Sequence, residues 1–192
     1  MHCHPKSKTM QITIRTERIL KVLYIISWVL FVGICIEASA FFLNAVFALV
    51  KPDLLSYLWK PVDMPQLLQY DHGYFFVVML IITIVHVLKA LMFYLIIKIL
   101  SDKKLDMALP FNQSVQRFIL SIAYLSFSIG LFSSWGSRHA EWLGTKGVTM
   151  PDMETMQLGG ADVWLFMGII LFVIAQIFKR GMEIQSEHEL TV

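Results

Sequence analysis

Residues 74–98 read YFFVVMLIITIVHVLKALMFYLIIK, and this stretch decides the fold. It is apolar over most of its length, and its formal charges are Lys89 within it and Lys98 at its end. A bilayer core about 30 Å thick needs roughly 20 helical residues to cross it. Hydrocarbon offers no water to an open backbone, so a helix is the expected form. The stretch therefore predicts a transmembrane helix.

Three further apolar stretches accompany this one. The spans expected are residues 22–42, 74–98, 118–137 and 161–178. Of the 192 residues, 57% are hydrophobic and 16% are charged, whereas soluble domains carry about 25% charged residues. We therefore predict an all-α, polytopic membrane protein with four transmembrane helices. Its membrane domain is residues 19–178, between tails of residues 1–18 and 179–192, and the lipid bilayer covers its apolar surface.

Lys and Arg residues are unevenly distributed between the two sides of these spans. Eleven of the 16 lie before the first span, after the fourth span, or around the connection between the second and third spans. Four lie in the other two connections, and Lys89 lies within a span. Because short loops rich in Lys and Arg stay in the cytoplasm, both termini are predicted to be cytoplasmic.

The N-terminal segment allows a second interpretation. A basic stretch, an apolar stretch and then Ala38-Ser39-Ala40 resemble a signal peptide with its cleavage site. Glu37 within that site and the apolar residues 41–43 favour a retained first span, and cleavage would leave the other three spans as drawn. Residues 1–9 are expected to be a disordered tail, with the true start at Met1 or at Met10.

No motif for catalysis, a cofactor or a metal is present in the sequence. There is no Gly-rich phosphate loop, paired CxxC, HExxH or nucleophile elbow. His2-Cys3-His4 is more typical of an unstructured terminus than of a metal site. Cys3 and Cys35 are not expected to meet. A net charge of +2 without a basic run indicates no direct nucleic-acid binding, and we expect no enzyme activity.

Polar side chains inside the predicted spans are functional candidates, because they are costly to place there. His86 and Lys89 lie near one stripe of the second span, and Glu37 lies in the first, four residues after Gly33. At about 1.5 Å per residue, Glu37 and His86 have comparable depths, whereas Lys89 differs from Glu37 by roughly 10 Å. The pattern indicates a proton-responsive or ligand-holding site, or else polar groups that only join helices.

The segments on the basic side carry recognisable helix signals. Pro110 is expected to end the connection, with Asn112 as the N-cap of the third span's helix. Gly181 is expected to break or cap the last helix, and Gly33 to allow close helix approach. Residues 179–192 mix acidic with apolar side chains, which favours a docking peptide for a soluble partner. The alternative is that this tail packs on the connection near Pro110 and Phe111.

Two of these motifs carry a resemblance to a known family. Pro110-Phe111 is followed by Val115-x-Arg117, and the chain ends in Phe178-x-x-Gly181 and then Glu187-x-x-Leu190-Thr191-Val192. With the order of the spans, they resemble bacterial membrane proteins catalogued as domain of unknown function 2975, over about residues 11–192. Ser114 departs from the family, where many members have Asn, and the Pro-Phe spacing is one residue shorter.

The resemblance implies a small protein of the bacterial cytoplasmic (inner) membrane, commonly encoded beside a Cro-like helix-turn-helix regulator. We expect a non-enzymatic sensor, or a membrane partner of such a cytoplasmic regulator. Its contact candidates are Pro110, Phe111, Arg117, Gly181, Glu187, Leu190, Thr191 and Val192. The alternative is a small carrier or transport accessory that uses Glu37, His86 and Lys89. The sequence specifies no oligomeric state.

The charge distribution gives a topology that a reporter can test. A reporter fused after Val192 should be active only in its cytoplasmic form, and one inserted at Gly147 only in its exported form. An exported reading at Val192, or a cytoplasmic reading at Gly147, would contradict the four-span topology.

Overall fold

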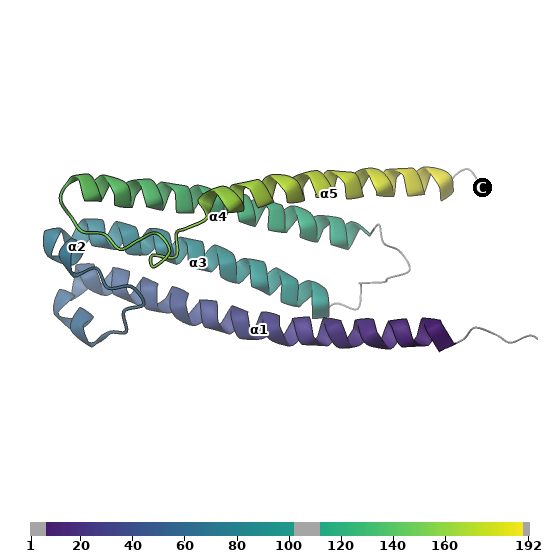
Figure 1. Ribbon diagram of the computed structural model, residues 1–192, viewed down its shortest axis with the longest axis horizontal. Helices are drawn as coiled ribbons and strands as arrows, with labels where there is room; N and C mark the ends of the chain where they lie inside the picture. The colour runs from purple at the N-terminus through teal and green to yellow at the C-terminus, as the bar shows by residue number, and fades with distance from the viewer. Residues whose placement is uncertain (1–6, 102–111, 190–192) are drawn as a thin grey trace, which may run out of the picture.

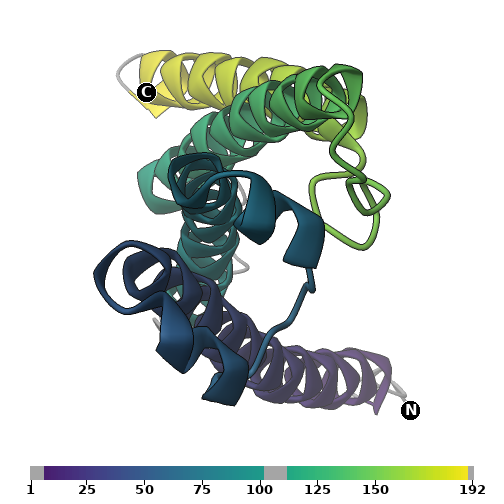
Figure 2. The same ribbon diagram turned by 90° about the vertical axis from the view of Figure 1, so that its left-hand side faces the viewer.

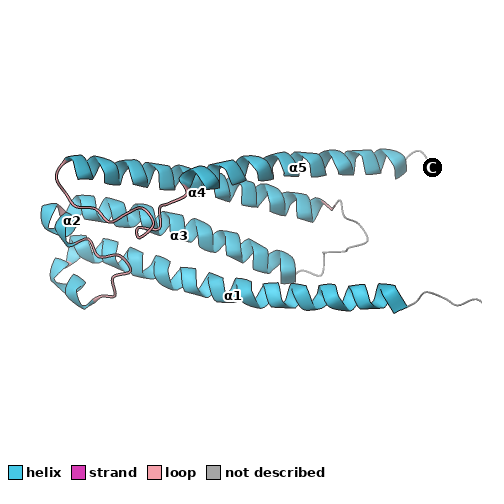
Figure 3. Cartoon of the chain, viewed as in Figure 1, coloured by secondary structure: helices cyan, strands magenta, loops and turns pink. Residues whose placement is uncertain are grey.

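The computed structural model describes residues 7–101 and 112–189, which form helices and their connections without any strand (Figure 3). The long helices are α1 (Ser7–Val50), α3 (His72–Ser101), α4 (Gln113–Thr145) and α5 (Ala161–Glu189). A 3₁₀ helix η1 (Pro52–Tyr57) and a short α2 (Pro65–Tyr70) lie between α1 and α3. The four long helices are each long and apolar enough to cross a membrane, so the predicted all-helical, four-span architecture is confirmed at that level.

The long helices form a curved row rather than a closed bundle. α1 packs on α3, α3 packs on α4, and α4 packs on α5 (Figures 1 and 2). Extensive packing between α1 and either α4 or α5 is absent from the described part of the chain. α3 is therefore the central helix and the most buried of the four.

The molecule has two different ends along the direction of the helix axes. The capped end is formed by residues 51–71 and 146–160, which fold over the helix ends (Figure 1). The tail end lies opposite, where α1 begins and α5 finishes (Figure 1). At the tail end, α1 and α5 both project beyond α3 and α4 (Figure 1).

α5 is shifted along the helix axis relative to α4. α5 begins level with the middle of α4, and the 146–160 loop runs back over the intervening distance (Figure 1). Gly130 of α4 lies against Leu165, and Gly168 of α5 lies against Phe127. The expected span 161–178 therefore runs alongside the expected span 118–137.

The hydrophobic core is concentrated at the capped end. It joins side chains of α1, α3 and α4 to side chains of both connections, and its fully buried members include Phe41, Leu67, Met79, Leu143 and Met156. Away from this end, the outward faces of α1 and α5 expose large apolar side chains along their length. Such a surface requires lipid to cover it. The structure thus combines a folded cap with lipid-facing helices.

Some helix ends lie where the sequence signals predicted them, and others do not. The Asn112 side chain accepts a hydrogen bond from the Ser114 N–H at 2.8 Å, so the predicted N-cap of α4 is confirmed. The prediction that Gly181 ends the last helix is wrong, because α5 continues to Glu189. An ion pair between Arg180 and Glu183, 2.9 Å apart and three residues along the helix, supports this continuation. Ser7–Thr9, expected to be disordered, form the start of α1.

Close helix approach occurs at glycines other than Gly33. A methyl group added at Gly33 would meet no atom within 4 Å, so the prediction for that residue is wrong. A methyl group at Gly168 would lie 3.0 Å from the Phe127 backbone nitrogen and 3.2 Å from the Ala123 carbonyl oxygen. Gly168 lets the α4 and α5 backbones touch, as small residues do in membrane helix pairs.

This contrast makes a paired prediction. Gly168→Ala should destabilise the protein by about 1–3 kcal/mol, because backbone atoms cannot yield to the added methyl group without separating α4 from α5. Gly33→Ala should be neutral or stabilising by up to roughly 1 kcal/mol, since alanine favours a helix interior. Reversible unfolding in mixed micelles measures both, and equal effects of the two variants would contradict the assigned packing.

Candidate intramembrane polar site

His86 is the centre of a polar cluster in the middle of α3. Its side chain is almost wholly buried, at 1% exposure. The Nδ1 atom lies 2.8 Å from the Ile82 carbonyl oxygen, one turn back along the helix. The Nε2 atom contacts Gln157 Oε1 and lies 3.6 Å from Glu37 Oε2. Residues from α1, α3 and the 146–160 loop therefore meet at one imidazole ring.

Glu37 approaches this ring from α1. Its side chain is 38% exposed, so it lies at the edge of the cluster and His86 lies inside. Phe41, one turn further along α1 and fully buried, packs on the ring with centroids 4.8 Å apart. This contact agrees with the comparable depths predicted for Glu37 and His86, although only His86 is buried.

The loop that supplies Gln157 has a compact internal structure. The Asp152 carboxylate accepts a hydrogen bond from the Thr155 N–H at 3.3 Å, and Leu158 N–H donates to Met153 O at 3.0 Å. Hydrogen bonds from the Thr155 side chain and backbone lower the pKa of the Asp152 carboxyl below its ordinary value. The turn therefore satisfies part of its own backbone through these internal hydrogen bonds.

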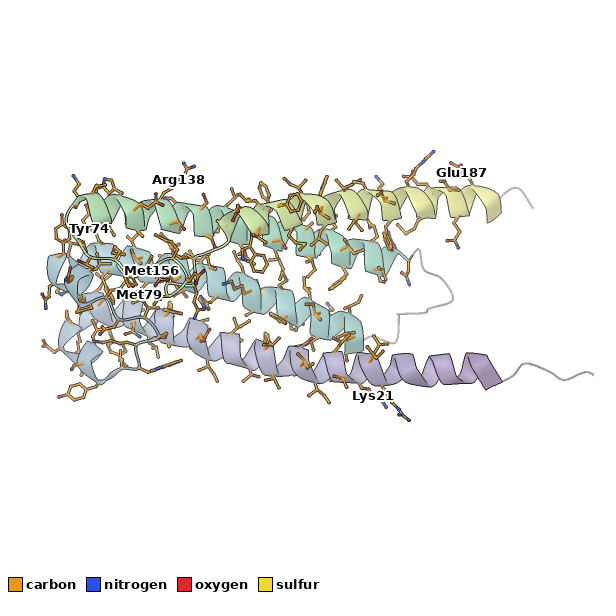
Figure 4. All side chains as sticks on the ribbon, viewed as in Figure 1. Lys21, Tyr74, Met79, Arg138, Met156 and Glu187 are labelled. Carbon is orange, nitrogen blue, oxygen red and sulfur yellow. The ribbon has the colours of Figure 1, made fainter. Side chains whose placement is uncertain are left out.

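Two apolar anchors hold this turn against the helices. Met156 and Leu158 are 0% and 1% exposed, and both join the core cluster around α3 (Figure 4 labels Met156 and Met79 of that cluster). Leu158 fills the space beside Gly136, where an added methyl group would lie 2.8 Å from its Cδ1 atom. Gln157 stands between the anchors with a φ of 57°, a left-handed conformation that costs a non-glycine residue about 1–2 kcal/mol. This backbone conformation is kept at the residue that reaches His86.

Lys89 joins the cluster through the same residue. Its Nζ donates to the Gln157 carbonyl oxygen at 3.3 Å. Lys89 and Glu37, which were expected to differ in depth, are therefore linked through His86 and the loop residue Gln157. The sequence analysis did not predict this role of the loop. Gln157 contacts the imidazole with its side chain and the ammonium group with its backbone. The cluster consists of Glu37, His86, Lys89 and Gln157, and we call it the His86 cluster.

The partners of His86 determine which of its ring nitrogens can carry a proton. Both ring nitrogens face oxygen atoms, namely the Ile82 carbonyl on one side and Gln157 Oε1 with the Glu37 carboxylate on the other. An imidazolium donates from both nitrogens and fits this arrangement, with Glu37 balancing its charge. A neutral ring donating to Ile82 fits only if the Gln157 amide turns and donates to Nε2. The cluster therefore has two arrangements that differ by one proton.

The other candidate residues lie apart from this cluster. Arg117 is exposed near the start of α4, Gly181 lies within α5, and Glu187 is exposed in its last turn (Figure 4). The remaining partner-contact candidates fall outside the described residues: Pro110, Phe111, Leu190, Thr191 and Val192. So does His2-Cys3-His4. In residues 7–101 and 112–189, no three His, Cys, Asp or Glu side chains group to hold a metal ion.

The sequence analysis missed two residues that the structure makes important. Gln157 lies in a loop that carried no polar motif, although Met153, Met156 and Leu158 are unusually apolar for an exposed connection. Asn44 is 1% exposed and its Nδ2 donates to the Ala40 and Trp59 carbonyl oxygens, which ties α1 to the segment after η1. An asparagine within an apolar helix was the available signal for this link.

The left-handed backbone of Gln157 allows a sharp test of its role. Gln157→Ala should destabilise the protein by about 1–3 kcal/mol, because a buried ring nitrogen loses its partner while the backbone cost remains. Gln157→Gly loses the same contact but relieves the backbone, so it should be the more stable of the two by about 1 kcal/mol. Reversible unfolding in mixed micelles measures the pair, and a less stable glycine variant would contradict the assigned conformation.

Comparisons with known proteins add no relative. No protein-family model, no curated protein sequence and no solved structure matches this chain. The family resemblance given by residues 110–117 and 178–192 therefore stays a prediction.

Proposed function

We propose that the protein is a non-enzymatic membrane sensor whose His86 cluster responds to protonation. The observation that carries this proposal is that both nitrogens of a buried imidazole face acceptors from three separate elements. Histidine is the side chain that gains or loses charge nearest to neutral pH. A proton exchanged here changes what holds α1, α3 and the 146–160 loop together.

The arrangement of the helices provides a route from this cluster to the tail end. α1 packs chiefly on α3, and Glu37 and His86 are part of that packing. A change in the Glu37–His86 attraction therefore biases the position of α1 against α3. α1 and α5 project at the tail end, which the Lys and Arg distribution assigns to the cytoplasm (Figure 1).

The projecting helices and the tail are the proposed contacts of a cytoplasmic partner. The family resemblance suggests a helix-turn-helix regulator for this role. Up to Glu189, the tail is a continuation of α5, which gives a partner a helical surface rather than an extended peptide. The same resemblance suggests placement in a bacterial inner membrane.

A carrier function is the second candidate, because a carboxylate, an imidazole and an amine gather within predicted spans. A cavity of about 540 Å³ lies beside α1, but it is lined by apolar residues such as Phe31, Leu43 and Trp59 and by none of the His86 cluster. A dye-loaded vesicle assay separates the two functions. Proton or solute flux that is lost in Glu37→Gln would support the carrier, and a sensor should show no flux above that of empty vesicles.

The sensor proposal predicts a pH-dependent loop. Loss of a proton from the His86 cluster would remove the attraction to Glu37, so amide exchange in residues 153–159 should be roughly tenfold faster at about pH 8 than at about pH 5.5 after correction for intrinsic rates. Glu37→Gln should diminish this change, because the ring then lacks the carboxylate whose attraction the proton controls. Hydrogen exchange with mass spectrometry on the reconstituted protein measures it.

Two variants decide the assignment. His86→Gln should abolish the pH dependence, whereas His139→Gln, which alters a half-buried histidine stacked on Trp142, should leave it intact. The lowered pKa of Asp152 keeps that carboxyl ionised throughout this range, so it contributes no change there. A pH dependence that survives in His86→Gln would refute the proposal.

A further inference from the structure

A second feature at the tail end is independent of the His86 cluster. A cavity of about 220 Å³ opens between α3 and α4. Its lining includes Leu95 and Lys98 from α3 and Ser114, Arg117, Phe118 and Ser121 from α4. We propose that this cavity binds an anionic glycerophospholipid, with the headgroup phosphate between Lys98 and Arg117 and an acyl chain along Leu95 and Phe118.

The depth of the cavity fits a lipid headgroup. Lys98 lies in the last turn of α3, which ends at Ser101, and Arg117 lies four residues after α4 begins at Gln113. The uncharged run of residues 118–137 starts immediately after Arg117. The two cations therefore lie where the helices leave the hydrocarbon, which is the level of the phosphates.

The charges of the cavity select for an anion. Lys98 and Arg117 are both exposed, and no acidic side chain is among the cavity's lining residues. Within the described parts of the chain, neither cation forms an ion pair. A guanidinium group binds phosphate oxygens through two parallel hydrogen bonds, and a lysine adds a point charge beside them. Basic pockets between membrane helices on the cytoplasmic side commonly bind acidic lipid headgroups.

The remaining walls distinguish a lipid from a free anion. Leu95, Ile99 and Phe118 are half-buried, and Leu95 and Phe118 lie on the side of the two cations that faces the middle of the helices. A soluble phosphate would use the cations and leave these side chains uncovered. A phospholipid satisfies both parts, because its acyl chain covers the apolar wall while its phosphate meets the charges.

The test compares phosphatidylglycerol with phosphatidylcholine on the purified full-length protein. Native mass spectrometry should detect a phosphatidylglycerol that stays bound at low lipid concentration, and phosphatidylcholine should bind much more weakly. Lys98→Gln with Arg117→Gln should weaken phosphatidylglycerol binding about 25-fold, from roughly fivefold per lost cation. Inorganic phosphate at millimolar concentration should not displace the lipid.

A matched pair of changes controls for net charge. Lys51→Gln with Arg138→Gln removes two exposed cations from the capped part of the row and should leave the affinity within about twofold of the wild type. Equal loss in both double variants would mean that overall charge, not the cavity, attracts the lipid. Unchanged binding in the Lys98 and Arg117 variant, or displacement by phosphate alone, would overturn the proposal.

A position-specific measurement keeps the test decisive if the double variant does not fold. Phe118→Trp places a fluorophore at the cavity, and Phe172→Trp places one on the exposed face of α5. In vesicles, brominated phosphatidylglycerol should quench the added fluorescence of Phe118→Trp at least threefold more strongly than brominated phosphatidylcholine does. Phe172→Trp should show no such preference, and a lack of preference at Phe118→Trp would refute the lipid site.

Discussion

The arrangement of this protein depends on how an irregular backbone segment is held between helices. Residues 152–160 return from the capped end to the middle of α3. A helix satisfies its own backbone hydrogen bonds there, whereas an irregular loop needs other partners. The turn closed by Asp152 and Thr155 supplies internal hydrogen bonds, and Met156 and Leu158 supply buried anchors. Because both anchors are seated against the helices, Gln157 is brought to His86.

This anchoring explains why an open row of helices can keep a defined shape. α1 and α5 bury little of their surface inside the protein, and the contacts that fix them are concentrated along α3 and α4. Hydrophobic burial within the protein is strongest at the capped end, where two connections close over three helices. Elsewhere the helices rely on close backbone approach, as at Gly168, because lipid provides little hydrophobic driving force between them.

Sequence reasoning predicted the features that depend on composition and on regular spacing. The number of spans follows from apolar run length, and the pairing of Glu37 with His86 follows from the constant rise of a helix. Gln157 was not predictable in this way, because its position depends on where an irregular loop folds back and no periodic pattern encodes that. The contact between Lys89 and Gln157 was missed for the same reason.

The errors at two glycines have a common physical cause. Gly33 was expected to be a contact and Gly181 a helix end, from residue type alone. A glycine allows close helix approach only if its face of the helix meets a neighbour. Gly33 lies on a face of α1 where an added methyl group would meet no atom within 4 Å. Whether a glycine ends a helix depends on the residues around it, and the ion pair between Arg180 and Glu183 spans Gly181 and supports a continuous helix.

The long separation between His86 and its loop partner has a consequence for biosynthesis. The two residues are 71 positions apart, whereas Glu37 precedes His86 on the growing chain. Once the hairpin of α1 and α3 has entered the bilayer, it already holds a buried histidine beside a carboxylate. The third participant leaves the ribosome only after α4 has been made. The loop therefore reaches a partly finished site late in synthesis, when only α5 is still to be made, so any factor assisting insertion must leave that site uncovered until then.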